Sequence, residues 1–303
     1  MSTEGKHSVR SVTIFMVVSF ALAYLLDWTL ILGIISISLF QFIALLRMYM
    51  PFLGVIAALT AEGKPLKREL IRLGTRLGKL KYLACAVAVP YIIYAIGVAI
   101  GYVAGWKAAN PIEEIIKTLN LPGASEIPLS DLNVALASLL LGSALSGVTI
   151  NAAAAYGEEI GWRGLLLDEL YPRLGRFSYV SIGIIWALWH APLILFLGYN
   201  YPRNREIGLA IYAVVLVAWT GIMCELKFKS DSLYPPAAMH GTINALAGLM
   251  LYTFPDVDAI YKLPVGLASA LSSYIVLAAY FAMQKLLGEK RNLKTEKSHE
   301  VQH

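Results

Sequence analysis

Charged residues are scarce in this chain of 303 residues, at 15% of the total, whereas 58% of the residues are hydrophobic. Soluble domains carry about 25% charged residues and about 45–50% apolar residues. The mean hydropathy of +0.64 points the same way. This composition excludes an ordinary soluble domain and predicts an integral membrane protein with little mass outside the bilayer.

Cysteine is almost absent, with only Cys85 and Cys224 in the whole chain. Each lies alone within an apolar run, and no CxxC spacing occurs. The sequence therefore favours packing roles for both side chains and indicates neither a disulfide framework nor a thiol mechanism.

What the chain has in abundance is long apolar runs without the strict alternation of barrel strands, so helices are predicted. About 20 apolar residues are needed for one spanning helix. We expect eight such helices, at residues 12–32, 34–59, 82–104, 132–156, 178–198, 207–226, 233–252 and 263–286. The predicted fold class is an all-α polytopic membrane bundle. Residues 1–287 form one domain, and residues 288–303 form a polar, disordered cytoplasmic tail.

The placement of Lys and Arg predicts the orientation of these helices. With the N-terminus in the cytoplasm, 19 of the 25 basic residues fall in inner segments and 5 in outer segments, and Arg47 lies within the second run. Because short loops rich in Lys and Arg stay in the cytoplasm, both termini are predicted there. The net charge of +5 is then explained by basic residues at the cytoplasmic face, where they bind anionic lipid headgroups. A nucleic-acid partner is not needed to explain this charge.

The most informative motif, Tyr156-Gly157-Glu158-Glu159-Ile160-Gly161-Trp162-Arg163-Gly164, follows the fourth apolar run. Ionisable residues beside the hydrocarbon core mark a functional site by default. Glu159 and Arg163 have the i, i+4 spacing and the orientation of a helical ion pair. Glu158 is rotated by about 100° from that pair and can point elsewhere. A purely structural salt-bridge cluster is the alternative, and it suits Glu159 and Arg163 better than Glu158.

Two further polar groups lie in later runs. His190 follows Trp186 by one helical turn, and Pro192 frees the backbone carbonyl of Leu188. His240 and Asn244 are spaced i, i+4 and therefore share one helix face. Each of these residues alone is typical of a helix–helix hydrogen bond. Their occurrence together with Glu158 favours a shared site.

Such residues can catalyse the attack of water on a carbonyl group in two ways. A glutamate and a histidine can activate water as a general base pair, with His240 and the Asn244 amide as donors to the oxyanion. Alternatively, Glu158, His190 and His240 can bind zinc and leave an open fourth position. An HExxH pattern occurs at His299-Glu300-Val301-Gln302-His303, in the predicted polar tail and outside these three motifs. Spacing does not choose between the two mechanisms.

The three motifs, in this order, resemble those of the CAAX prenyl protease and bacteriocin-processing family of intramembrane endopeptidases. The residues that carry the resemblance are Glu158, Glu159, Arg163, His190, His240 and Asn244. The resemblance covers mainly residues 150–250. Trp186 and Trp162 stand where Phe is usual in the family, and both keep an aromatic ring.

The resemblance implies a role for each residue. Glu158 and His190 would activate water, His240 and Asn244 would stabilise the oxyanion, and Glu159 and Arg163 would support the site. A glutamate mechanism without a cofactor is favoured, and a zinc metalloendopeptidase is the alternative.

The implied substrate is a prenylated peptide or a membrane protein cut near its C-terminus, with the active site facing the cytoplasm. The membrane would be the cell membrane of a prokaryote or the endoplasmic reticulum of a eukaryote. The alternatives from other classes are a non-catalytic scaffold or immunity protein of the same fold, or a transporter whose polar residues line a pathway.

Overall fold

The computed structural model describes the backbone of residues 9–120 and 127–300 and the side chains as far as residue 287. All regular elements in these ranges are helical, which confirms the predicted all-α fold class. The elements in chain order are α1 (Val9–Ile31), η1 (Ile37–Leu39), α2 (Phe40–Met48), α3 (Met50–Ala61), α4 (Leu66–Leu73), α5 (Lys81–Val103), α6 (Pro111–Thr118), α7 (Leu129–Val148), α8 (Ile150–Glu159), η3 (Ile160–Leu166), α9 (Leu167–Leu174), α10 (Phe177–Trp189), η4 (Leu193–Leu197), α11 (Arg205–Ser230), α12 (Tyr234–Tyr252) and α13 (Leu267–Glu300).

Several of these helices are long and apolar enough to cross a bilayer, so the chain is a multi-pass membrane protein. Six segments in the described ranges meet that criterion, namely Val9–Ile31, Ile37–Ala61, Lys81–Val103, Leu129–Val148, Arg205–Ser230 and Leu267–Leu287. The expected spans at 178–198 and 233–252 are not among them. The segment 178–198 contains only the 13-residue α10 before the His190 turn, and this helix is too short to cross a bilayer. The segment 233–252 contains the polar residues His240 and Asn244, which lower its mean hydropathy. The count of eight stays a prediction.

Two expected spans are interrupted rather than continuous. The run predicted over 132–156 breaks at Thr149, whose φ of −120° and ψ of −98° are not helical. The side-chain hydroxyl of Thr149 bonds back to the carbonyl of Leu145, and the Tyr234 hydroxyl donates to the carbonyl of Val148 at 2.5 Å. The break therefore turns α8 away from the axis of α7. The carbonyls of Leu145 and Val148 in the last turn of α7 still accept hydrogen bonds.

The second interruption lies between α2 and α3, at Tyr49. The Tyr49 hydroxyl donates to the carbonyl of Ala153 in α8 at 3.0 Å. Both interruptions thus meet at α8, the helix that carries the glutamate pair.

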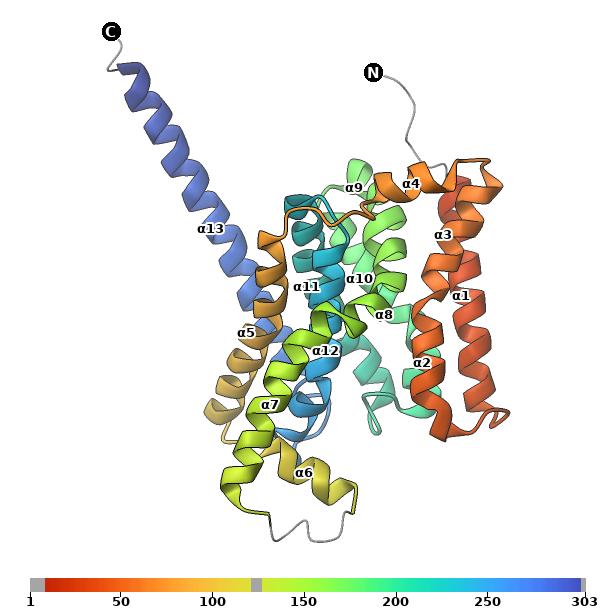
Figure 1. Cartoon of the computed structure of the whole chain (residues 1–303), viewed down its shortest axis with the longest axis vertical. Coiled ribbons are helices and arrows are strands. Elements are labelled where there is room, and N and C mark those ends of the chain that lie inside the picture. The colour runs from red at the N-terminus through yellow and green to blue at the C-terminus, as the bar shows by residue number, and fades with distance from the viewer. Residues whose placement is uncertain (1–8, 121–126, 301–303) are drawn as a thin grey trace.

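In the bundle, α12 packs along α7 and α8, α11 packs along α10, and α1 packs along α3. The start of α1 lies at the end of the bundle that holds α4 and α9, and α13 extends outward past the same end, whereas α6 lies at the opposite end (Figure 1). The core at the centre of these helices contains the indoles of Trp162, Trp186 and Trp189, each at most 2% exposed. A polar site surrounded by these rings is screened from bulk water.

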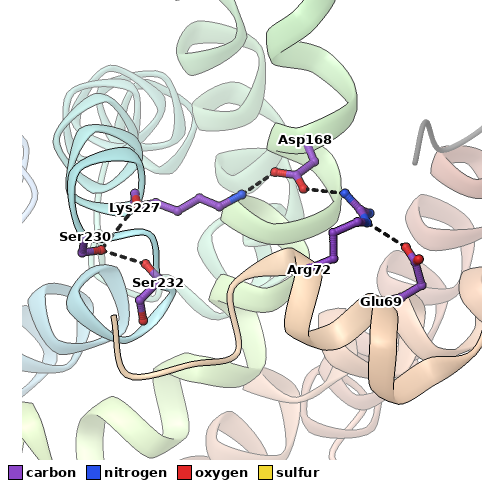
Figure 2. A network of polar contacts seen from close by, with 6 residues as sticks. All are labelled: Glu69, Arg72, Asp168, Lys227, Ser230 and Ser232. Atoms are coloured by element: carbon purple, nitrogen blue, oxygen red, sulfur yellow. Dashed lines mark hydrogen bonds and ion pairs between the residues drawn. The ribbon is translucent and has the colours of Figure 1, made fainter. Parts of the chain in front are cut away.

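At the end where α4 lies, a polar network joins three distant segments. Arg72 of α4 donates to Glu69 at 2.9 Å and to Asp168 of α9 at 3.1 Å. Asp168 also pairs with Lys227 of α11. Figure 2 shows Asp168 lying between the two cations. This network fastens the basic segment that follows α3 to the helices α9 and α11.

The last helix, α13, continues as helical backbone to Glu300. The sequence predicts a disordered tail from residue 288, whereas the backbone is helical as far as Glu300. Lys, Glu, Arg and Leu dominate this stretch and are strong helix formers, even where no apolar run continues. Residues 301–303 lie outside the described residues.

Candidate functional site

The glutamate pair lies where α8 passes into η3, a short π-helical segment. Single π-helical turns inside α-helices occur often at functional sites. At Gly161, an added Cβ would lie 2.8 Å from the side chains of Phe15 and Pro51. Glycine at this position therefore allows α1 and α3 to approach the segment closely.

Glu158 is 2% exposed and is held by two indoles. Its Oε2 accepts a hydrogen bond from Trp186 Nε1 at 2.6 Å and one from Trp162 Nε1 at 3.3 Å. Trp162 and Trp186 stand where the family that the motifs resemble usually has phenylalanine. The indole N–H groups add these two hydrogen bonds, since a phenyl ring has no N–H to donate. Oε1 of Glu158 accepts no hydrogen bond from the described residues, so it can contact a water molecule.

Glu159 points to a different set of partners. Its Oε1 accepts from Arg163 Nη1 at 3.0 Å and lies 2.9 Å from Nδ1 of His240. The Arg163 guanidinium also donates to the Thr220 hydroxyl at 2.9 Å and lies over the Trp186 ring at 4.3 Å. The ion pair expected from helical spacing is present, and both side chains are fully buried.

His190 ends α10, and its Nδ1 lies 2.9 Å from the carbonyl oxygen of Trp186. A carbonyl only accepts, so Nδ1 must carry the proton in this bond. Nε2 of the neutral ring is then an acceptor. The carbonyl of Leu188, which Pro192 frees, accepts a hydrogen bond from the Tyr24 hydroxyl at 2.7 Å, so α1 supplies the missing donor.

His240 and Asn244 project from α12. Because the Glu159 carboxylate accepts from Nδ1 of His240, Nε2 of that ring is the nitrogen left for other contacts. The Asn244 side chain is exposed. Neither Asn244 nor Nε2 of His240 donates to another described residue, so both are available to a ligand.

One small cavity brings the four predicted reactive residues together. It has a volume of about 80 Å³ and is lined by Glu158, His190, His240 and Asn244 among others. These four residues come from α8, the end of α10, and α12. The predicted supporting residues Glu159 and Arg163 lie behind the cavity wall and contact it through His240 and Trp186.

The same cavity is also lined by residues that the sequence motifs do not predict, chiefly Arg47, Tyr199 and Tyr212. Arg47 is 3% exposed, and its Nε donates to Asp27 of α1 at 2.7 Å. A signal for this pair exists in the sequence, because Asp27 and Arg47 are opposite charges in consecutive apolar runs. Charges within apolar runs are rare and usually paired.

In the zinc alternative, Glu158, His190 and His240 would be the three protein ligands of the metal ion. No group of three His, Cys, Asp or Glu side chains in the described ranges is arranged to hold a metal ion. Arg47 adds a fixed positive charge to the wall of the same cavity, and that charge opposes a divalent cation. The geometry of the described side chains therefore gives no support to a metal-dependent endopeptidase.

Comparison with known proteins matches the part of the chain that holds this site. The model of the family described as type II CAAX prenyl endopeptidase Rce1-like matches residues 140–246. A protein of Methanococcus maripaludis named CAAX prenyl protease 2 is 47% identical over 111 residues. That match spans 33% of this chain and 39% of the relative, about two-fifths of its length. The resemblance stated from the motifs is confirmed over this part of the chain, where residues 140–246 match the type II CAAX prenyl endopeptidase Rce1-like family.

Proposed function

We propose that this protein is an intramembrane endopeptidase that hydrolyses a peptide bond near the C-terminus of a membrane-associated substrate, using water activated by Glu158 and His190. The observation that carries the proposal is the single cavity lined by Glu158, His190, His240 and Asn244. The family match to a CAAX prenyl endopeptidase supports peptidase chemistry at that place.

In the proposed reaction, a water molecule binds between Glu158 Oε1 and Nε2 of His190. Glu158 removes a proton as the water oxygen attacks the scissile carbonyl carbon. The two indoles on Oε2 hold the carboxylate in one orientation, which keeps Oε1 directed for proton transfer. When the C–N bond breaks, the same proton passes from Glu158 to the leaving amine, so atoms and charges balance.

The attack creates an oxyanion that needs hydrogen-bond donors. The Asn244 amide is one donor. His240 is the other, and Nε2 donates only when the ring is the imidazolium, because Nδ1 already donates to Glu159. Glu159 and Arg163 thus act as positioning residues for His240.

The substrate class follows from the family and the membrane setting. A lipid-modified peptide, such as a prenylated C-terminal segment, reaches a buried cavity laterally from the bilayer, and we place the active site toward the cytoplasm. A larger cavity of about 730 Å³ adjoins the catalytic cavity at Tyr199, which lines both. This larger cavity gives room for peptide residues on one side of the scissile bond.

The experiment uses purified full-length protein in detergent and a quenched prenylated peptide with a C-terminal CAAX sequence. The wild type is expected to release the fluorescent product. Glu158→Gln keeps the shape and the acceptor oxygen but removes the base, so kcat is expected to fall by about 10³-fold or more. Glu206→Gln, an exposed glutamate of α11, is the matched control and should keep full activity.

Two results would contradict parts of this proposal. A wild type that cleaves neither this peptide nor an unprenylated one is not the expected peptidase and fits the scaffold or transporter alternatives. Loss of cleavage with a chelator, restored by added zinc, would instead establish the metal-dependent mechanism and refute the metal-free one.

A further inference from the structure

Arg47 is a buried cation in the wall of the catalytic cavity that the reaction described above does not use. Its guanidinium is held on three sides. Nε donates to Asp27 at 2.7 Å, and Nη2 donates to the carbonyl of Trp189. The Cζ atom of Arg47 lies 3.5 Å from the centroid of the Trp189 ring. Nη1 donates to none of the described residues. The side chain is therefore fixed in place with one donor nitrogen unused.

Arg47 is also the only Lys or Arg among the described residues that line this cavity. Burying a guanidinium and a carboxylate in a membrane bundle is unfavourable unless excellent geometry compensates for the lost hydration. Here the compensation is incomplete, since Oδ2 of Asp27 is buried without a hydrogen-bond partner. Simple stabilisation of α1 against α2 explains this arrangement poorly, because well-packed apolar residues would serve at least as well.

The reaction itself lacks one permanent cation. The Asn244 amide is neutral, and His240 donates from Nε2 only while its ring is protonated. An anionic tetrahedral intermediate in a cavity of about 80 Å³ has little water to stabilise it. A guanidinium stays charged at every accessible pH and acts most strongly in such water-poor surroundings.

From these contacts we infer that Arg47 is a further catalytic residue, whose Nη1 donates to the oxyanion of the tetrahedral intermediate beside His240 and Asn244. Asp27 and Trp189 are its positioning residues. This inference rests on the proposed hydrolysis at Glu158 and adds a permanently charged donor to it. Arg47 forms no bond to the substrate and exchanges no proton, so the atom balance of the reaction is unchanged.

The test compares two peptide analogues that differ at the scissile position. One carries a phosphinate, which is tetrahedral and anionic like the intermediate, and the other carries a neutral ketomethylene group. Inhibition constants are measured for the wild type, Arg47→Gln, Arg47→Lys and Asp27→Asn, with thermal unfolding recorded for each. The wild type is expected to bind the phosphinate about 10- to 100-fold more tightly than the ketomethylene analogue.

Arg47→Gln should abolish that preference while binding the neutral analogue as the wild type does. Arg47→Lys should recover part of the preference, and Asp27→Asn should retain most of it, because Arg47 keeps its charge. If Arg47→Gln weakens both analogues equally, the residue is structural and the inference is wrong. If Arg47→Gln does not fold, Arg47→Lys decides, because lysine lacks Nη1. An Arg47→Lys variant that keeps the full preference of the wild type for the phosphinate would also refute the inference.

These outcomes remain distinct from failure of the proposed function. A wild type that cleaves the peptide but shows no preference for the phosphinate refutes only the role of Arg47. A wild type that neither cleaves the peptide nor binds either analogue refutes the hydrolysis at Glu158 and the role of Arg47 with it.

Discussion

At the scale of single residues, the two adjacent glutamates have separate environments, although they are neighbours in the chain. Glu158 faces the cavity and accepts from two indoles, while Glu159 lies behind it between Arg163 and His240. The difference arises from the helical rotation of about 100° between successive residues. One carboxylate is thus free to act on water, and the other orients a histidine.

The Arg163 guanidinium is fully buried, and Thr220 is one of its partners, at 2.9 Å. Thr220→Val keeps the shape of the side chain but leaves that N–H without an acceptor. We expect this change to lower the free energy of unfolding by about 1–3 kcal/mol. We also expect a lower kcat, because Arg163 and Glu159 orient His240. Thermal unfolding in detergent and peptide hydrolysis measure the two effects.

Thr220→Ser is the matched control, since it keeps the hydroxyl and removes only a methyl group. It should retain most of the activity. Equal activity of Thr220→Val and the wild type would show that the contact between Arg163 and Thr220 does not support the site.

At the scale of elements, breaks in helices position the site. The interruption at Thr149 sets α8 at an angle to α7, and the turn at His190 ends α10 inside the bundle. The close packing of α12 against the Thr149 break depends on Gly241, where an added Cβ would lie 2.6 Å from the backbone nitrogen of Ala152 and 2.7 Å from the carbonyl oxygen of Gly147.

Gly241→Ala is therefore expected to push α12 away from α7 and α8. Overpacking of this kind destabilises a protein by about 1–3 kcal/mol. Activity should fall further, because His240 and Asn244 flank this glycine on the same helix. Gly248→Ala, on α12 with no atom within 4 Å of the added Cβ, is the control and should be close to neutral. Similar unfolding temperatures for both variants would contradict the proposed role of the contact.

At the scale of the whole molecule, the distribution of basic residues predicts which end of the bundle faces the cytoplasm. The segment joining α3 to α5 holds six of the 25 Lys and Arg residues, and α5 begins with Lys81. Arg72 of this segment joins Asp168 and Lys227 in a polar network (Figure 2). Retention of basic loops in the cytoplasm predicts this orientation.

The prediction is tested by cysteine labelling in intact cells, after Cys85 and Cys224 are replaced by serine. A membrane-impermeant maleimide should label Ser36→Cys, in the loop between α1 and α2. It should label Lys79→Cys only after the membrane is permeabilised. Both side chains are exposed in the structure. The reverse labelling pattern would place both chain ends and the α4 segment outside the cytoplasm and contradict the predicted topology.

The sequence by itself determined the helical membrane fold, since long apolar runs leave few alternatives in a bilayer. It also determined the ion pair of Glu159 with Arg163 and the shared face of His240 and Asn244, because both follow from the local geometry of one helix. The carbonyl freed by Pro192 was likewise predictable, although its partner Tyr24 was not.

Only the tertiary structure decided how the helices cross, and therefore which side chains meet. Three hydrogen bonds of the site join residues that are 20 or more positions apart in the chain. They are the bonds from Trp186 to Glu158, from His240 to Glu159 and from Arg47 to Asp27. The interruptions at Tyr49 and Thr149 lie in runs that hydropathy alone predicts to be continuous, although Pro51 closely follows the first of them. Helical periodicity specifies the face of a residue, whereas packing between helices selects the residue opposite it.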